Sequence, residues 1–526
     1  MTVLIAAGCG GTSSTKQTSS GEASKAATSF YTGWPHGGTP KRGGTLTVDT
    51  LEAPSSFLPW GATSFPVPEQ QIYDTLFEAM PGASETSTTL EPALVSSWSL
   101  SPDHLTYTFH LREGVQFSNG EPLTAEDVVY SVDHTEVPAS QAYSFTKLWE
   151  QPIALNSTTV QLKTRKPQIA LPDVLSTAYF SIVPKKLVER EGLKYFGLHP
   201  VGTGPFTFQS ATAGFTKITL VRNPHYWRGG GLPYLNGVVF NQVESGNARI
   251  LAVRSGAADV AQAIPYAQAE ALRSTPEVKM LIGPEWGASL NAFNRDKAPL
   301  NEVSVRRALL YATPYAEIIK SIYKGIGTQA NSQWGELKYY NPKVPYYPYD
   351  IAKAKELLKE SSVPNGFSMT IAVVSGDTQG ELLASILQSA WAQIGIHVAI
   401  QTQPATTLYA NFGQQKFDFD VFPVEQGFSV LYNPDPVSLY YNSHEPGFAP
   451  PVAASTVRDI EKATESASES ERQKLFGEVQ YQTYWKEAIF DSIVNLVSLN
   501  LVSNHLRGYR VLSSTAVPMQ LAWLES

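Results

Sequence analysis

The single cysteine of the chain, Cys9, is the residue whose position most restricts its chemistry. A lone thiol cannot form an internal disulfide, a cysteine-based zinc site or a Cys-x-x-Cys redox pair. It stands directly after the short apolar and small run Val3 to Gly8, and no cysteine follows it. This placement suits an exported protein that avoids thiol oxidation.

Small residues before a cysteine, after a short apolar run, resemble the lipobox of bacterial lipoproteins. That resemblance implies that Cys9 becomes the lipidated first residue of the mature chain. Because the segment lacks a basic region and its apolar stretch is short, we expect the true translation start to lie upstream. The alternative is an apolar tip with an incidental cysteine. We expect residues 1–9 to be a truncated lipoprotein signal and residues 10–42, rich in Ser, Thr and Gly, to be a flexible linker.

No catalytic pattern accounts for the remaining polar residues. The chain has no Gly-x-x-x-x-Gly-Lys phosphate loop, no Gly-x-Ser-x-Gly elbow and no His-Glu-x-x-His zinc helix. Gly202-Thr203-Gly204 lacks the third glycine of a dinucleotide loop and precedes a strand-like segment, so we interpret it as a backbone turn between lobes. The histidines are scattered, and the carboxylates show no recognisable spacing. We therefore expect no enzyme, no metal site and no cofactor, although glycosidase acids can lie far apart in a chain.

Composition narrows the class of protein further. With 42% apolar and 11% aromatic residues the chain can build real cores, and its 526 residues correspond to about two to four domains. The net charge of −8 and the absence of a Lys/Arg-rich block argue against a nucleic-acid partner. No apolar run reaches the roughly 18 residues that a spanning helix needs.

Short segments along the body carry clear secondary-structure signals. Alternating apolar residues predict strands at 45–48, 106–111 and 217–221. Thr124, followed by two acids, predicts a helix start, and Asp350 opens a second helix over 351–360.

The clearest unit runs from Ser368 to Gln403. A strand over 369–374 is followed by a helical apolar stripe from Leu382 to Ile394, which we expect Gly395 to cap. A second strand follows at 396–400. Strand, helix and strand at this spacing predict a right-handed parallel crossover, so the fold class is α/β, mixed with α+β.

Several segments together resemble the bacterial extracellular solute-binding proteins of family 5, the dipeptide- and oligopeptide-binding components of ABC importers. The most specific is Leu111 to Val129 (LREGVQFSNGEPLTAEDVV). The others follow in the expected order along the chain: Pro200–Phe206 (PVGTGPF), Arg222–Trp227 (RNPHYW), Val305–Leu309 (VRRAL), Tyr323–Thr328 (YKGIGT), Tyr349–Leu358 and Pro434–Pro436 (PDP).

The resemblance implies a two-lobed, type II periplasmic-binding-protein fold that closes over its ligand by a hinge motion. Lobe I would comprise residues 43–284, with an inserted subdomain at about 76–200. Lobe II would comprise residues 285–494, and residues 495–526 would return to lobe I. The implied partners are a small solute and the permease subunits of an ABC transporter, with a monomeric chain lipid-anchored to the outer face of the cytoplasmic membrane.

The sequence departs from the family pattern at one expected ligand-binding position. In peptide-binding relatives an aspartate three residues before the matched Asp-Pro pairs with the amino terminus of the ligand, and Tyr432 stands at that place here. A phenol cannot supply the negative charge that holds an ammonium in a dry cleft. Either Glu425 or Asp435 takes over the amine, or the ligand has no free amino terminus.

Other candidate ligand contacts come from loops expected to meet at the lobe junction. Aromatic faces with a few polar groups suit peptide side chains or sugar rings, and ordinary packing is the alternative for each aromatic residue. The candidates are Phe57, Trp60, Trp286, Gln333, Trp334 and Gln426.

The sequence thus favours the substrate-binding component of an ABC importer that captures a peptide-like solute. An oligosaccharide, an opine-like solute or a metal chelate is the alternative in the same role, and a secreted hydrolase is the alternative from another class.

Overall fold

The computed structural model describes residues 38–60, 67–81, 88–134, 146, 148–332, 338–404, 407–408, 418–427, 452–512 and 516–525. At residues 88, 284–286 and 424–427 it describes the backbone alone. The predicted signal segment with Cys9, and the linker up to residue 37, lie outside these ranges.

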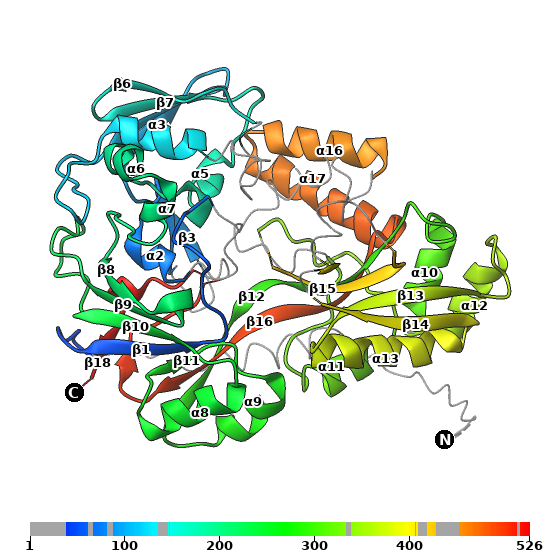
Figure 1. Ribbon diagram of the computed structural model, residues 1–526. Coiled ribbons are helices and arrows are strands. Elements are labelled where there is room, and N and C mark those ends of the chain that lie inside the picture. The colour runs from blue at the N-terminus through cyan, green and yellow to red at the C-terminus, as the bar shows by residue number, and fades with distance from the viewer. Residues whose placement is uncertain are drawn as a thin grey trace, which may run out of the picture.

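A ten-stranded mixed sheet runs through the whole molecule (Figure 1). Its strand order is β14-β13-β15-β12-β16-β11-β1-β10-β9-β8. The strands span, in chain order, β1 (Thr45–Thr50), β8 (Phe206–Ala211), β9 (Lys217–Arg222), β10 (Gly237–Gln242), β11 (Val260–Ala261), β12 (Val278–Phe293), β13 (Phe367–Val374), β14 (Ile396–Gln403), β15 (Val421–Gly427) and β16 (Phe490–Ser503).

Two long antiparallel strands, β12 and β16, join the two halves of this sheet. Their register shifts between Ile282 and Glu285 and again before Gly287, as expected where a ladder bends. Figure 1 shows the pair crossing the middle of the molecule from one lobe to the other. The fold is therefore two-lobed and mixed α/β, as predicted. The predicted boundaries after residues 284 and 494 fall within these two strands.

Lobe I is built on β1, β8, β9 and β10, which form one apolar core. The predicted strands at 45–48 and 217–221 are confirmed as β1 and β9. Helices α8 (Gly246–Ser255) and α9 (Tyr266–Arg273) pack against β11, β12 and β16. The chain returns to the lobe I core near its C-terminus, through Leu506, Tyr509, Val511, Val517, Met519 and Ala522.

A separate four-stranded sheet lies above lobe I, with its own apolar core. Its strands are β4 (Val95–Leu100), β5 (Thr106–Leu111), β6 (Ile153–Asn156) and β7 (Thr159–Lys163), and a hairpin of β2 (Phe77–Pro81) and β3 (Thr88–Pro92) leads into it. We call this sheet and the helix α3 (Ala125–Asp133) the subdomain.

The start of α3 is confirmed as predicted. Thr124 and Asp127 form a reciprocal capping box there.

The helices that precede and follow the subdomain sheet in the chain are short. They are α2 (Glu69–Ile72), α5 (Leu171–Val174), α6 (Lys185–Glu191) and α7 (Leu193–Phe196).

Lobe II contains the predicted crossover. Strands β13 and β14 precede and follow α13 (Thr378–Ala392) in the chain and pair with each other in parallel. Trp391, in the last turn of α13, has a fully buried side chain. Gly395 does not cap α13, because the helix ends at Ala392 with Gln393 as its C-cap. Gly395 instead takes a φ of 84° in the turn into β14.

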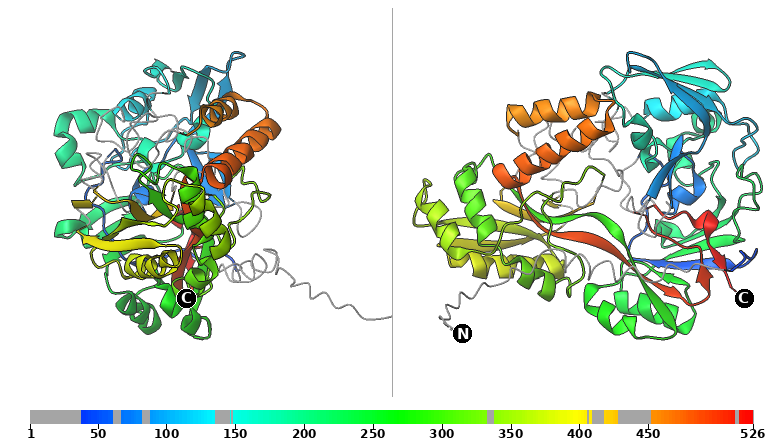
Figure 2. Two further views of the ribbon diagram at one scale, coloured as in Figure 1. Left: turned by 90° about the vertical axis from the view of Figure 1, so that its right-hand side faces the viewer. Right: turned by 180° about the vertical axis from the view of Figure 1, so that it is seen from behind.

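The other helices of lobe II include α12, whose first turn is capped by Asp350 as predicted. They span α10 (Val303–Tyr311), α11 (Tyr315–Ser321), α12 (Ile351–Lys359), α16 (Ala454–Glu465) and α17 (Glu469–Gln480). Helices α16 and α17 form a hairpin that is seen clearly from behind in Figure 2. Among the described residues, no helix combines the length and apolar character that crossing a membrane requires.

Candidate solute-binding site

Three predicted ligand contacts lie on neighbouring strands close to the lobe crossing. Trp286 is part of β12, and Glu425 and Gln426 are part of β15. The two strands are antiparallel, and Glu425 stands opposite Ser289 in the register. The backbone thus brings these distant segments together. Their role as ligand contacts stays a prediction, since only their backbone is described.

Two further candidates, Phe57 and Trp60, lie inside lobe I. The ring of Phe57 is fully buried and packs edge-on against Phe208 and Phe215, at centroid distances of 5.4 and 5.1 Å. The indole Nε1 of Trp60 donates to the Ser131 carbonyl oxygen at 3.0 Å. Both side chains therefore contribute to the lobe I core, and a ligand contact for either stays a prediction.

Four candidates lie outside the described residues: Gln333, Trp334, Tyr432 and Asp435.

Lobe I contains a small polar cavity of about 80 Å³. Its lining holds two carboxylates, several hydroxyl groups and two side-chain amides. None of these described lining residues is a lysine, an arginine or a histidine. The lining residues are Gln70, Tyr73, Asp74, Thr75, Glu78, Ala79, Ser176, Thr177, Ala178, Ser181, Pro205, Ala516, Val517, Pro518 and Gln520. We call this space the polar cavity.

Asp74 is the best-connected acid of the polar cavity. Its Oδ2 accepts hydrogen bonds from Thr203 Oγ1 and from Trp227 Nε1, both at 2.8 Å. Burial raises the pKa of the Asp74 carboxyl, while these two hydrogen bonds and the charge of Arg228 oppose the rise. The carboxylate is therefore held in place by neutral donors.

The turn at Gly202-Thr203-Gly204 positions one of those donors. A Cβ at Gly204 would collide with the backbone of Ile72, so this close approach requires glycine. The preceding residue, Val201, packs against the cores of both lobe I and the subdomain. The prediction that this turn lies between the lobes is therefore wrong, because it joins two parts of one lobe.

Sequence reasoning missed the polar cavity. Thr203 lies 129 residues and Trp227 lies 153 residues after Asp74 in the chain, and no sequence periodicity links the three. The available signal was the resemblance itself, because the Pro200–Phe206 and Arg222–Trp227 segments converge on Asp74.

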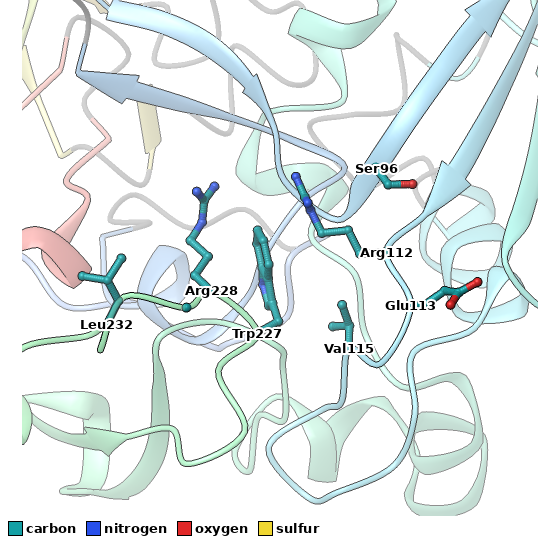
Figure 3. A pocket seen from close by; sticks show the side chains of 8 residues that line it. Ser96, Arg112, Glu113, Val115, Trp227, Arg228 and Leu232 are labelled. Atoms are coloured by element: carbon teal, nitrogen blue, oxygen red, sulfur yellow. The ribbon is translucent and has the colours of Figure 1, made fainter.

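The same tryptophan forms one wall of a larger, more open pocket of about 600 Å³ (Figure 3). The guanidinium groups of Arg112 and Arg228 lie over the Trp227 ring, at 5.0 and 4.6 Å from its centroid. Arg228 also forms an ion pair with Glu78. Glu78 lines the polar cavity and Arg228 lines the larger pocket, so this ion pair links the linings of the two spaces.

The parts of the chain that the structure describes hold no cluster of three or more His, Cys, Asp or Glu side chains suited to a metal ion.

Two lobes joined by a pair of long antiparallel strands are the architecture of a two-lobed solute-binding protein. Residues 89–449 match the family described as "Bacterial extracellular solute-binding proteins, family 5 Middle". The chain belongs to this family, as its sequence motifs predicted.

Relatives with known roles support the same conclusion. Heme-binding protein A of Haemophilus influenzae is 30% identical over 399 residues, which are 70% of this chain and 71% of that protein. Glutathione-binding protein GsiB of Escherichia coli is 30% identical over 319 residues, and the match spans 60% of this chain and 62% of that protein.

A solved structure matches almost the whole chain. It is the ABC transporter-associated periplasmic binding protein DppA of Helicobacter pylori in complex with the peptide STSA, with a TM-score of 0.81 at 26% identity. The match covers 92% of this chain and 99% of DppA. This chain is therefore a solute-binding component of an ABC importer.

Proposed function

We propose that the solute is peptide-like and is held between the two lobes. The observation that carries this proposal is the likeness to DppA over 92% of the chain, because that structure contains a bound tetrapeptide. The relationship to a glutathione-binding protein supports it, since glutathione is itself a small peptide-like molecule.

The amine of such a peptide needs a partner other than Tyr432. Glu425 is our preferred candidate, because β15 places its backbone beside β12 close to the lobe crossing. Asp435 is the alternative. Trp286, Trp334, Gln333 and Gln426 would supply aromatic and amide contacts to the peptide.

In the proposed role the chain binds its solute and does not catalyse a reaction. The family and the matched relatives are binding proteins, and closure of two lobes stabilises a ligand only through contacts made to both. ATP hydrolysis would take place on other subunits of the importer. A hydrolase is not favoured by any of these relatives.

We further propose that the chain is monomeric and attached to the outer face of the cytoplasmic membrane through a lipid on Cys9. The resemblance of residues 3–9 to a lipobox supports the attachment. One acyl chain binds membranes marginally, and two or more hold firmly.

Solutes of other chemistry would fit the same fold. The structures of AgaA with agropinic acid and of NikA with Fe(III)-EDTA match this chain at 22% and 19% identity, which shows a shared fold alone.

Native mass spectrometry of gently purified protein tests the proposed solute class. We expect an adduct whose fragmentation yields amino-acid residues. An adduct that fragments as a saccharide, an opine or a metal chelate would reject the peptide proposal and leave the importer role intact.

A further inference from the structure

The polar cavity holds buried acceptor atoms that lack partners. Thr177 is only 5% exposed, and its Oγ1 makes no hydrogen bond. The Oε1 atom of Gln70 is also buried without a partner. Leaving one such group unsatisfied costs about 1–3 kcal/mol, so each atom points to a donor that binds from outside the chain.

The charges around the polar cavity favour a cation as that donor. Asp74 and Glu78 are the two acids in the wall. Arg228 forms an ion pair with Glu78, whereas the direct partners of Asp74 are the neutral donors Thr203 and Trp227. One buried carboxylate is therefore left without its own ion pair, which is costly unless a cation joins it.

The size of the cavity restricts which cation can enter. A water molecule occupies about 30 Å³ in the liquid, so a space of about 80 Å³ corresponds to two or three waters. That space suits a compact terminal ammonium with its adjacent methylene group. An ammonium offers three donors, which matches the carboxylate of Asp74, the hydroxyl of Thr177 and the amide oxygen of Gln70.

We propose that the polar cavity is a subsite for a primary ammonium group of the bound solute. The inference rests on the proposed function, because it assumes that the captured solute reaches the lobe I wall. It adds a solute class: a peptide-like molecule with a primary amine, such as a lysine side chain.

The first test compares matched peptides by isothermal titration calorimetry. The probes are Ala-Lys-Ala and Ala-norleucine-Ala, which share length and stem and differ in the ammonium. The wild-type chain should bind the lysine peptide about 10-fold more tightly, equal to about 1.4 kcal/mol. Asp74→Asn and Thr177→Val should bring the two affinities within about 3-fold of each other, largely by weakening the lysine peptide. An unchanged preference in both variants would overturn the subsite.

Thermal unfolding separates a binding role from a structural one. Thr177→Val removes an unpartnered hydroxyl, so the unliganded variant should unfold at the same temperature as wild type or higher. The matched control is Thr164→Val in the subdomain, where the buried hydroxyl donates to the Leu105 carbonyl oxygen at 3.0 Å. That control should lower the unfolding temperature and preserve the lysine preference. A loss of stability in Thr177→Val would contradict the proposal.

A second probe tests the subsite without any peptide. The indole N–H resonance of Trp227, assigned with Trp227→Phe, reports on Asp74 through their hydrogen bond. Titration with n-butylammonium should shift this resonance, and n-butanol should leave it unchanged. Equal shifts, or no shift, would mean that the cavity does not select a cation and would overturn the subsite. A butylammonium shift without binding of either peptide would reject the peptide proposal and retain the subsite.

Discussion

Lys166 Nζ lies 3.2 Å from Glu461 Oε1 and 3.9 Å from Glu465 Oε1. Lys166 follows the last strand of the subdomain on lobe I, and both glutamates belong to α16, which packs with lobe II. The ion pairs therefore bridge the two lobes. The side chains are 40–61% exposed, so the contacts are screened by salt and worth at most about 1 kcal/mol.

Lys166→Ala should speed release of the co-purified solute by at most about 5-fold, because a contact across the lobes stabilises the conformation in which they lie close. Stopped-flow dissociation at low salt measures the effect, which should shrink at high salt. Lys163→Ala is the matched control, since its partner Glu150 lies in the same subdomain at 3.1 Å. Equal effects of both variants would contradict a specific role for Lys166.

Asp491 should make the stability of the chain depend on pH. Burial raises the pKa of its carboxyl to about 6, although Tyr315, Asn291 and Thr313 all donate to it. The folded state therefore binds more protons than the unfolded state between about pH 4 and pH 6. Stability from this group is complete below that window and falls by about 2–3 kcal/mol as pH rises through it.

Asp491→Asn isolates this contribution. Relative to wild type, the variant should be more stable at pH 7 than at pH 4, since an amide does not ionise. Thermal unfolding of both proteins at several pH values measures the difference. A constant difference across the range would show that Asp491 does not titrate there.

Gly327→Ala should destabilise the chain by more than the neighbouring change Gly325→Ala. Both glycines have positive φ values, 92° and 75°, which cost an alanine about 1–2 kcal/mol. A Cβ at Gly327 would also lie 2.8 Å from the Asn495 carbonyl oxygen in β16, whereas a Cβ at Gly325 meets nothing. Chemical denaturation of the two variants measures the excess. Equal losses would mean that the approach to β16 relaxes freely.

Intact mass of protein prepared from membranes of the native host tests the proposed anchor. We expect a chain that begins at Cys9 and carries acyl groups. An unmodified chain that retains Met1 would end the proposal.

Local signals predicted the elements well, because capping and alternation are encoded by neighbouring residues. The strand over Thr106–Leu111 and the capped start at Thr124 are both observed. The parallel crossover through α13 followed from apolar spacing alone.

The polar cavity could not be predicted in the same way. Its contacts depend on side chains that only the folded sheet brings together, as Trp227 and Asp74 show. Residue type alone does not separate packing from binding: Phe57 is a candidate ligand contact, and its ring is fully buried in the core.

The central claim is that the chain binds a peptide-like solute, and a thermal-shift comparison tests it most directly. Ligand-free protein is heated with tri- and tetrapeptides and, separately, with oligosaccharides of similar mass. A peptide at about 100 times its Kd should stabilise the chain by about 2.7 kcal/mol, and the saccharides should leave it unchanged. A large shift with a saccharide and none with any peptide would contradict the account.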